Sequence, residues 1–451
     1  MAFPVRLALF FSVMATTVST SPNNIDWFRN TGPYIRGHQG RTFVIYLGNG
    51  AVESAGFNNL IYDLALMHLL GIRLVLVHAT RHAIDRALDE RGIPGPLHRG
   101  VRITDAAVLD VARDITAAQR LSLESRLSMG LPDSPMRGAR LRVVSGNFVT
   151  ARPLGIVDGV DFQYTGAIRR LDAAGIVSAL DNQAIVLLSP LGFSPTGEVF
   201  NLSADELATA AAIATGADKL IIMDREEGLK QPDGQLIRQC TVANARDVAP
   251  ANELQAAHIS AACTVCEQGV SRAHLVSFET DGALIAELFT HDGAGTLISD
   301  QEFELARRAG IDDIAGILEL IKPLEESGVL VKRSRELLEQ EIENFRVLDR
   351  DGRIIACAAL YPFNDAGMAE VACIVTHNDY RGENRGEHLL SLLEQEARSM
   401  AISTLFVLTT QSSHWFQEQG FSEQPLSVLP AERQDLYNLQ RNSKVLTRSI
   451  G

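Results

Sequence analysis

The sequence predicts an α/β protein in two parts, a first part with a largely parallel sheet and a second part of mixed α+β type. Two observations lead to this prediction. From Arg41 to about Ile298, short apolar runs of strand type alternate with helical stretches, which is the pattern of βα units. Beyond residue 300 the strand-type runs follow one another through a hairpin signal, and fewer helices separate them.

The first part begins with a buried strand over Thr42–Leu47, closed by Gly48-Asn49-Gly50. Asn59–Leu70 has apolar residues at helical spacing and predicts a helix, and Arg73–His78 predicts the next strand. Two further apolar runs repeat the pattern, Ala184–Leu188 and Lys219–Met223. Ligands of parallel sheets bind at the carboxyl ends of the strands, so a site is expected there.

The boundary between the parts is predicted near residue 300. Thr290–Asp300 contains the glycine-rich stretch Asp292–Thr296 and is expected to form a loop. We expect an extension over 1–22, a first domain over 23–298, a linker over 299–304 and a second domain over 305–451.

In the second part, Asp312 or Asp313 is expected to cap a helix that Pro323 ends. Asp351-Gly352 predicts a hairpin between two strands. The expected strands are Phe345–Asp349, Ile354–Leu360, Glu370–Val375 and Leu405–Thr409, and the expected amphipathic helix is Glu387–Arg398.

Composition excludes several classes of protein. The 451 residues are 46% hydrophobic and 21% charged, which is typical of globular chains. The net charge of −14 and the lack of a basic stripe argue against a nucleic-acid partner. Five cysteines are an odd number and too few for a disulfide scaffold, which favours a reduced, cytoplasmic location. Cys263-Thr-Val-Cys266 has no partner pair, so we expect two buried thiols and no metal.

One segment raises the question of a membrane or a targeting signal. The apolar run Leu7–Ala15 follows a single Arg6 and precedes a Thr/Ser-rich stretch. It is too short to span a bilayer, but it is similar to the core of a signal peptide. We favour an N-terminal extension and no membrane association, because the rest of the chain has the character of a cytoplasmic metabolic enzyme.

The stretch Arg381–Gly386 (Arg-Gly-Glu-Asn-Arg-Gly) lies between a predicted strand and an amphipathic helix. A loop that enters a helix presents free N–H groups, and small residues let a phosphate approach them. The two arginines add positive charge. Such a loop suits a pyrophosphate, although on this hexapeptide alone an ordinary glycine-containing turn with solvated arginines is the favoured interpretation.

The order of elements around this loop resembles the GNAT N-acetyltransferases. Arg381–Gly386 stands where that family has its (Gln/Arg)-x-x-Gly-x-(Gly/Ala) acetyl-CoA motif, with Asn384 in place of the central glycine. Leu330–Glu336 and Leu436–Lys444, with Glu370–Cys373 and Phe406–Thr410, further resemble the bacterial N-acetylglutamate synthases. The resemblance covers about Asn23 to Lys444. It implies an amino-acid-kinase-like three-layer α/β domain followed by a mixed α+β GNAT acetyltransferase domain.

The resemblance also implies roles for single residues in an acetyl transfer from acetyl-CoA to L-glutamate. Arg333 and Arg441 would bind the carboxylates of glutamate, with Ser443 and the backbone of Cys373 assisting. Glu370 would be the general base, and His414 or Ser413 could supply the acid, since Phe416 stands where many relatives have a tyrosine. The acetyl-CoA ligands would be Cys373, Val375, Arg381, Gly382, Glu383, Asn384, Arg385 and Gly386.

The first part resembles the amino-acid kinases, but it lacks their phosphoryl-transfer residues. Tyr46 occupies the position of their phosphate-binding lysine, and His78–His82 replaces their glycine-rich loop. Asn201–Asp205 still matches a polar motif of that family. The segments that resemble those of arginine-sensitive members place Tyr34, His274, Glu287 and Gly293 at an arginine site.

We therefore expect an enzyme that makes N-acetyl-L-glutamate, opens arginine biosynthesis and is inhibited by L-arginine. A homo-oligomer is expected, with a hexamer as the candidate form, because the N-terminal helix resembles one used for hexamer assembly. Two alternatives stay open, an acetylglutamate kinase and a non-catalytic amino-acid sensor. Tyr46 argues against the kinase, and the presence of Arg333, Arg441 and Glu370 argues against the sensor.

Overall fold

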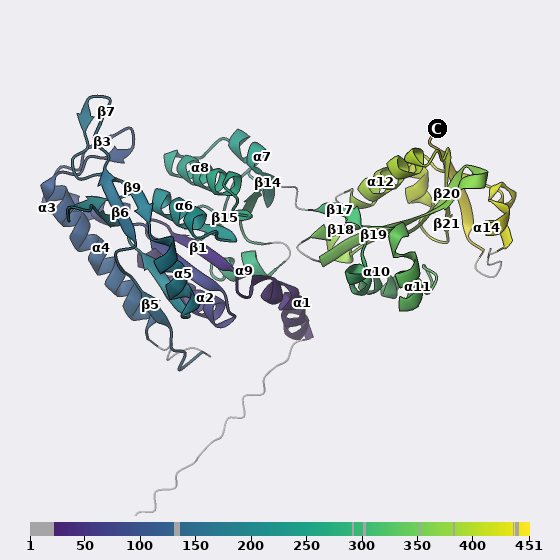
Figure 1. Cartoon of the computed structure of the whole chain (residues 1–451), viewed down its shortest axis with the longest axis horizontal. Helices are drawn as coiled ribbons and strands as arrows, with labels where there is room; N and C mark the ends of the chain where they lie inside the picture. Colours follow the sequence, from purple (N-terminus) through teal and green to yellow (C-terminus); the bar gives the residue numbers. More distant parts are fainter. Residues whose placement is uncertain are drawn as a thin grey trace, which may run out of the picture. The chain divides into compact units, whose positions relative to one another are not determined.

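The computed structural model describes residues 22–129, 136–290, 293–300, 304–350, 353–381, 384–435, 437 and 442–451. The chain divides into two compact units, Met1–Asp300 and Gln301–Gly451, which we call the N-terminal and the C-terminal unit. Each unit has its own sheet and its own covering helices (Figure 1). Of the predicted extension over 1–22, only Pro22 is described, and helix α1 (Pro22–His38) begins there.

The main sheet of the N-terminal unit has eight strands, in the order β14-β16-β15-β13-β1-β2-β10-β5. All neighbouring strands are parallel except the antiparallel pair β15–β16, so the predicted, largely parallel sheet is confirmed. The strands are β14 (Gln239–Thr241), β16 (Thr296–Ser299), β15 (Arg272–Ser277), β13 (Lys219–Asp224), β1 (Thr42–Leu47), β2 (Arg73–His78), β10 (Ala184–Leu188) and β5 (Arg142–Val144).

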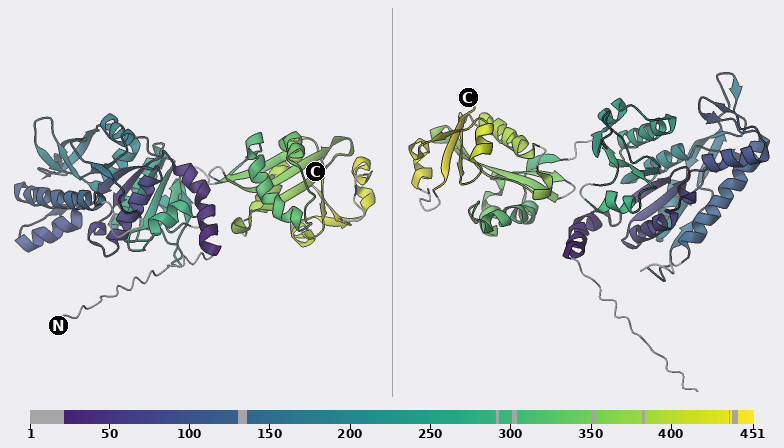
Figure 2. Two further views of the ribbon diagram at one scale, coloured as in Figure 1. Left: turned by 90° about the horizontal axis from the view of Figure 1, so that it is seen from below. Right: turned by 180° about the vertical axis from the view of Figure 1, so that it is seen from behind.

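Helices cover both faces of this sheet (Figure 2), which gives the unit three layers. Successive residues of a strand point to opposite faces, and β1 therefore contributes Phe43 and Ile45 to one core and Val44 and Tyr46 to the other. The first core packs under α2 (Phe57–Leu69), α4 (Ala106–Leu127) and α9 (Ala283–Phe289), and the second under α5 (Ala173–Asp181), α6 (Ala204–Ala214) and α8 (Glu253–Glu267).

The N-terminal unit also contains a four-stranded sheet in the order β12-β11-β6-β9 and two short hairpins. These strands are β12 (Val199–Asn201), β11 (Leu191–Phe193), β6 (Val149–Pro153) and β9 (Gly166–Leu171), with the hairpins β3 (Leu97–His98)–β4 (Val101–Arg102) and β7 (Ile156–Val157)–β8 (Val160–Asp161). The remaining α-helices are α3 (Arg81–Arg91) and α7 (Val242–Asp247).

The C-terminal unit is built on one seven-stranded sheet in the order β17-β18-β19-β20-β21-β23-β22. Neighbouring strands are antiparallel except β20 and β21, which run parallel. The strands are β17 (Leu305–Arg308), β18 (Phe345–Arg350), β19 (Arg353–Phe363), β20 (Met368–Thr376), β21 (Thr404–Thr409), β23 (Lys444–Ser449) and β22 (Ser422–Gln424).

Two hydrophobic clusters fix the helices on this sheet. Helices α10 (Ile314–Glu326) and α11 (Arg335–Glu341) pack on one face, and α12 (Arg385–Ser399) packs on the other through its Leu389, Leu390 and Leu393 stripe. The short helices α13 (Ser413–Glu418) and α14 (Ala431–Asp435) follow β21 and precede β23. The predicted mixed α+β architecture of this part is confirmed.

Two local predictions are wrong, and a third is confirmed only in part. Residues 296–299 form the buried strand β16 and not a loop, because they complete the sheet between β14 and β15. Helix α10 continues past Pro323 to Glu326, as a proline in the last turn removes only one helical hydrogen bond. Asp313 does stand at the N-cap position of α10, but its side chain makes no capping hydrogen bond there, because its carboxylate accepts from the Gly310 N–H and from Arg307.

The Asp351-Gly352 turn and positions 301–303 of the predicted linker lie outside the described residues. Strands β18 and β19 do pair antiparallel on either side of that turn. None of the described helices combines the length and the apolar character that a membrane span requires.

Candidate functional site

The centre of the C-terminal sheet has an edge that is left unpaired. Strand β20 pairs with β21 only over Met368–Glu370, opposite Thr404–Phe406. Cys373 has a left-handed backbone (φ 51°), and the register of β20 against β19 shifts beside it. Residues 371–376, which we call the open edge of β20, therefore have no strand partner on the β21 side among the described residues. Unpaired N–H and C=O groups of this kind can bind an extended amide chain.

Cys373 and Val375, the predicted pantetheine ligands, both lie on the open edge of β20. Their side chains are buried in the cluster that packs under α10, so only their backbone groups can contact a ligand at the edge. Burial raises the pKa of the Cys373 thiol to about 11; Arg333 opposes this, and the carboxylates of Glu325 and Glu370 add to it. A thiol in this state is a poor nucleophile, which supports a direct transfer without an acyl-enzyme.

The loop before α12 presents backbone rather than side chains. Asn384 precedes the helix with a left-handed backbone (φ 56°), and the first helical residue is Arg385. The Arg385 side chain is buried, because its guanidinium binds Glu304 at 2.5–2.8 Å and the Tyr380 carbonyl at 2.6 Å. Of the predicted pyrophosphate ligands, Arg385 can thus offer only its N–H, whereas Arg381 is exposed.

Gly386 lets a neighbouring helix approach this loop. A Cβ atom at this position would lie 3.1 Å from the Trp415 ring, so the glycine gives α13 room to pack beside the first turn of α12. Gly382 and Glu383, the other predicted ligands in the loop, lie outside the described residues.

Arg333 lies in a half-buried cluster next to the same strand. Burial alone would lower its pKa, but the neighbouring Cys373 thiol and Tyr361 hydroxyl together raise it. The Tyr361 hydroxyl donates a hydrogen bond to Glu341 at 2.7 Å, and burial raises the pKa of Tyr361. The Arg333 backbone N–H donates to Glu325 at 2.8 Å. Arg333 is thus held as a cation close to Cys373, whereas the supporting Tyr361 and Glu341 carry no sequence signal that we recognised.

Glu370, the predicted base, ends the short stretch of β20 that pairs with β21. Its carboxylate forms two contacts with Arg433 of α14, Nε–Oε2 at 2.5 Å and Nη2–Oε1 at 3.0 Å. Both side chains are largely buried, with exposed fractions of 11% and 21%. Arg433 could not be predicted as a partner of Glu370 from the sequence, because it is separated from Glu370 by 63 positions and stands in no recognised motif.

The remaining predicted transferase residues are only partly placed. His414 is exposed on the first turn of α13. Ser443 is half-buried, and its carbonyl accepts a hydrogen bond from the Tyr437 hydroxyl at 2.6 Å. Arg441, the second predicted carboxylate ligand, lies outside the described residues.

The N-terminal unit carries a fixed polar cluster where the resemblance places phosphoryl transfer. Tyr46 is buried and packs edge-on against the ring of His258, with 5.3 Å between ring centroids. His258 lies 3.0 Å from Asp205 and 3.3 Å from Asp224, so its ring stands between the two carboxylates. Burial raises the pKa of Tyr46, and nearby Asp205 adds to the shift. An uncharged phenol cannot replace the cationic stabilisation that phosphoryl transfer needs.

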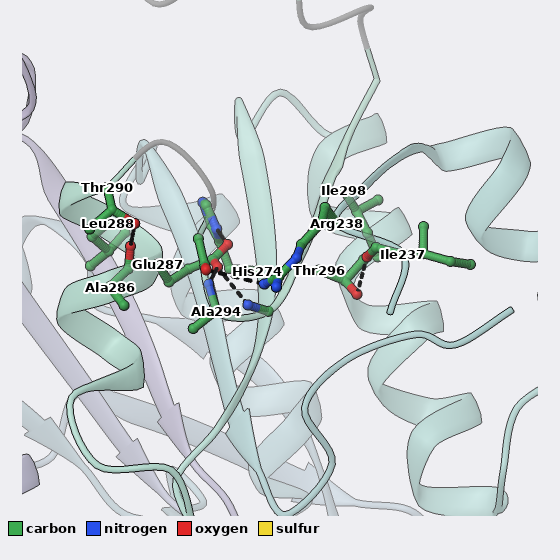
Figure 3. Close-up of polar contacts among 12 residues, drawn as sticks. Ile237, Arg238, His274, Ala286, Glu287, Leu288, Thr290, Ala294, Thr296 and Ile298 are labelled. Carbon is green, nitrogen blue, oxygen red and sulfur yellow. Dashed lines mark hydrogen bonds and ion pairs between the residues drawn. The ribbon is translucent and has the colours of Figure 1, made fainter. Parts of the chain in front are cut away.

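A second buried cluster joins two of the predicted arginine ligands (Figure 3). His274 of β15 donates from Nδ1 to Glu287 of α9 at 2.6 Å, and the other Glu287 oxygen accepts from the N–H groups of Ala294 and Gly295 at 2.8 and 2.7 Å. Both side chains are almost fully buried. Gly293 has a left-handed backbone (φ 63°), and a Cβ there would lie 2.6 Å from the Glu287 carboxylate.

The charges of this cluster follow from its burial. Burial and the neighbouring Lys219 lower the pKa of His274 to about 4, so its ring is neutral near pH 7. Burial would raise the pKa of Glu287, but the hydrogen bonds from His274, Ala294 and Gly295 outweigh it and lower the pKa. The cluster therefore presents one negative charge, held by neutral donors.

The other members of the predicted arginine site have different surroundings. Arg238 donates to the Gly293 carbonyl at 3.1 Å, and its side chain extends toward the Glu287 cluster (Figure 3). Tyr34 is half-buried on α1 and packs against the core under α9. The described hydrogen bonds do not join it to His274, Glu287 or Gly293. No group of three or more His, Cys, Asp or Glu among the described residues is arranged to hold a metal ion.

Two family models match the chain. The amino acid kinase family matches residues 41–277, and the acetyltransferase (GNAT) family matches residues 314–421. The chain is 50% identical over 434 residues to an amino-acid acetyltransferase of Pseudomonas putida (strain GB-1), an alignment that spans 95% of this chain and all of the relative. It is 49% identical over 431 residues to the amino-acid acetyltransferase of Pseudomonas fluorescens (strain Pf0-1), with the same coverage.

A solved structure is similar over both units. The N-acetylglutamate synthase of Neisseria gonorrhoeae, complexed with coenzyme A and L-arginine, matches with a TM-score of 0.86 and 36% identity, over 94% of this chain and 99% of that one. A second structure of a synthase from that organism, complexed with coenzyme A and N-acetyl-glutamate, matches with a TM-score of 0.59 and 37% identity, over 95% of this chain and 99% of that one.

Proposed function

We propose that this chain, which belongs to the amino-acid acetyltransferases, transfers the acetyl group of acetyl-CoA to the amino group of L-glutamate. The observation that carries the choice of acceptor is the convergence of Arg333 and Glu370 on Cys373, where β20 parts from β21. A cation for a carboxylate and a carboxylate for an ammonium group then lie beside one strand edge. N-acetyl-L-glutamate would be the product, and its synthesis would open arginine biosynthesis.

The acceptor has two carboxylates, and arginine binds a carboxylate through two parallel N–H···O contacts. We assign one carboxylate to Arg333, whose pKa is raised by its surroundings. By the resemblance we assign the other to Arg441, with Ser443 and the Cys373 backbone completing the pocket. The half-buried position of Arg333 supports its assignment, because a desolvated cation binds an anion more strongly than an exposed one.

The chemistry requires a neutral amine. We assign Glu370 to take the ammonium proton, directly or through a water molecule. The amine nitrogen then attacks the thioester carbonyl, the new C–N bond forms, and the C–S bond breaks. Coenzyme A leaves as a thiolate and takes up one proton. His414 is our candidate for that acid, with Ser413 as the alternative, and the exposure of His414 leaves it accessible.

The donor would bind across the open edge of β20 and the first turn of α12. The edge offers backbone N–H and C=O groups to the two amides of pantetheine. The N-terminus of α12 offers N–H groups to the pyrophosphate, with Arg381 adding positive charge. The buried Arg385–Glu304 pair would hold the loop in place and not contact the phosphates.

We further infer that L-arginine inhibits the enzyme by binding the N-terminal unit. A buried carboxylate next to backbone carbonyls is a suitable receptor for a guanidinium group. Glu287 supplies the carboxylate. The Glu287 carboxylate already accepts three of the roughly four hydrogen bonds that it can accept. The Gly293 carbonyl would therefore have to accept a hydrogen bond from the guanidinium group as well. Inhibition by the end product of the pathway is consistent with a remote effector site.

One assay separates this proposal from the alternatives. The purified full-length chain is incubated with L-glutamate and either acetyl-CoA or ATP, and the products are identified by mass spectrometry. We expect N-acetyl-L-glutamate with acetyl-CoA and no phosphorylated product with ATP. Aspartate and glutamine serve as control acceptors, since each lacks part of the double-carboxylate geometry. Equal rates with glutamine would contradict the assignment of the acceptor.

The predicted homo-oligomer is part of the proposal. Helix α1 exposes Ile25, Trp27 and Phe28, at 42%, 48% and 65% of their surfaces. Exposed aromatic residues gathered on one helix are typical of a contact surface. Light scattering behind size exclusion is expected to show an oligomer, and Trp27→Glu with Phe28→Glu is expected to dissociate it.

A further inference from the structure

We propose that Arg433 is a positioning residue of the acetyl transfer, which acts by holding the carboxylate of Glu370 in one orientation. The inference rests on the proposed role of Glu370 as the base. It goes beyond that role, because it assigns a function to a residue outside every recognised motif of the chain.

The contact itself is a two-point clamp. Nε and Nη2 of Arg433 each bind a different oxygen of Glu370, at 2.5 and 3.0 Å. Two contacts from a planar guanidinium fix the plane of the carboxylate as well as its position. Because both side chains are largely buried, water does not compete strongly for the pair.

Helix α14 is held firmly enough for Arg433 to act as a clamp. Leu429, just before the helix, is buried in a cluster with Met368 and Phe406, which flank Glu370 on the sheet. The Pro430 carbonyl accepts from the N–H groups of Arg433 and Gln434 at 2.9 and 3.0 Å and closes the first turn. The guanidinium is thus anchored to the part of the sheet that carries the base.

The clamp leaves Glu370 able to act. An ionised carboxylate offers about four acceptor positions, and the clamp uses two of them. An ammonium group or an ordered water can donate to the positions that remain. Arg433 also balances the buried charge of Glu370, which would otherwise be costly. Its role is therefore to direct the free positions of the base and not to contact the substrate.

The location of α14 connects the clamp to the acceptor pocket. The chain runs from Asp435, the last residue of α14, to Tyr437, whose hydroxyl binds the Ser443 carbonyl at 2.6 Å. Ser443 is one of the proposed glutamate ligands. Arg433 thus precedes Ser443 by ten residues in the chain, and the Tyr437 hydroxyl joins the segment after α14 to Ser443.

The test is a double-mutant cycle on the full-length chain with Arg433→Gln and Glu370→Gln. In the wild-type background, Arg433→Gln is expected to lower kcat about 10- to 100-fold, since a misplaced catalytic group costs about this much. KM for acetyl-CoA is expected to stay constant. In the Glu370→Gln background the same change is expected to cost less than about 3-fold, because residues that act as a unit are not additive.

A conservative variant and a matched control complete the design. Arg433→Lys keeps the charge but offers a single point of contact, so kcat should fall between wild type and Arg433→Gln. Arg398→Gln is the control: Arg398 binds Glu394 at 2.7 Å on α12, and it is 57% exposed. It should leave kcat unchanged. If Arg433→Gln does not fold, as judged by thermal melting, the cycle is run with Arg433→Lys.

The outcomes are distinguishable. A kcat of Arg433→Gln within about 3-fold of wild type, or equal losses in both backgrounds, overturns the positioning role and leaves Glu370 as the base. A Glu370→Gln variant with full activity overturns the proposed base and the clamp with it. If Arg433→Gln lowers kcat in the chain that retains Glu370 but not in the Glu370→Gln variant, the clamp is supported.

Discussion

The two units of the chain treat their buried ionisable groups differently. In the N-terminal unit burial favours the neutral form of several of them: it lowers the pKa of His78 and His274 to about 4, so that both rings are neutral near pH 7, and that of Lys219 to about 7, so that about half of it is neutral there. The C-terminal unit pairs its buried charges instead, as in Arg385–Glu304 and Arg433–Glu370. The first arrangement avoids the cost of a buried charge, whereas the second offsets it.

This difference matches what each unit is proposed to do. A transferase site for a doubly negative acceptor needs charges that persist across the pH range around neutrality, and ion pairs keep them. A receptor for a guanidinium group needs a negative charge, which Glu287 supplies while it accepts hydrogen bonds from neutral donors. The comparison predicts that charge changes in the C-terminal unit act on catalysis, and that those in the N-terminal unit act on regulation and stability.

The largest expected effect is that of Glu370→Gln on turnover. Removing a general base without changing its shape typically lowers the rate by about 10²–10⁴-fold. Both substrates should still bind, since Arg333 and the open edge of β20 are unchanged. Steady-state kinetics at saturating substrates measure the effect, and Glu432→Gln, an exposed neighbour of Arg433 on α14, is the control. A loss of only a few-fold at every pH would exclude Glu370 as the base.

The next effect concerns the acceptor alone. Arg333→Ala, and by the same argument Arg441→Ala, removes a charged hydrogen-bond partner worth about 1.5–3 kcal/mol, which corresponds to about a 10- to 100-fold rise in KM for glutamate. KM for acetyl-CoA should barely change. The matched control is Arg335→Ala, an exposed arginine paired with Glu339. If acetyl-CoA binding suffered and glutamate binding did not, the assignment would be rejected.

The strands differ in how far they could be predicted from the sequence alone. Strands such as Thr42–Leu47 are readable, because a strand buried on both faces is a continuous apolar run. The four-residue strand β16 is not, because it follows a glycine-rich stretch and is specified by its neighbours β14 and β15. Its presence matters for the proposed effector site, since Ala294 and Gly295 lead into it and bind Glu287.

Candidate site residues could be proposed from the sequence only where a family motif carries them. Glu370 and Arg333 stand in recognisable segments, whereas their partners Arg433 and Tyr361 contact them through the fold. Arg385 shows the opposite case: the motif suggests a phosphate ligand, but the three-dimensional structure binds its side chain to Glu304. A pattern of residue types cannot tell which side of a loop a side chain occupies.

The third effect tests the N-terminal half of the comparison. Glu287→Gln keeps the shape but removes the charge that would face the guanidinium of arginine. Coupling between remote sites is typically worth about 1–3 kcal/mol, so the arginine concentration for half inhibition should rise by at least about 5-fold. Uninhibited turnover should stay the same. Glu279→Gln, at an exposed carboxylate of the same unit, is the control.

An arginine titration at low and at saturating glutamate measures this effect. Inhibition that competes strictly with glutamate and survives Glu287→Gln would place arginine in the transferase pocket. The N-terminal unit would then need a role other than arginine binding. The proposed relation between its uncharged buried groups and the binding of an effector would fail.

The smallest effect concerns stability. It tests directly whether burial favours the uncharged form of an ionisable group in the N-terminal unit. Lys219 lies at the start of β13 with 7% of its surface exposed and its Nζ 5.7 Å from the centre of the Phe43 ring. Burial, with a contribution from Arg272, lowers its pKa from 10.5 to about 7.

Between those two pH values the unfolded chain binds one proton more than the folded chain, so this lysine makes the N-terminal unit more stable as pH rises. From pH 7 to pH 8 the gain should be about 1 kcal/mol, because over that range the unfolded lysine holds a full proton and the folded lysine holds on average only about a quarter of one. Lys219→Met should remove this gain, whereas Lys230→Met, at an exposed lysine, should retain it. Urea unfolding of the N-terminal transition at both pH values measures the difference between each variant and wild type. An unchanged pH dependence in Lys219→Met would mean that Lys219 stays charged in the folded unit, and the contrast with the ion-paired C-terminal unit would lose its clearest example.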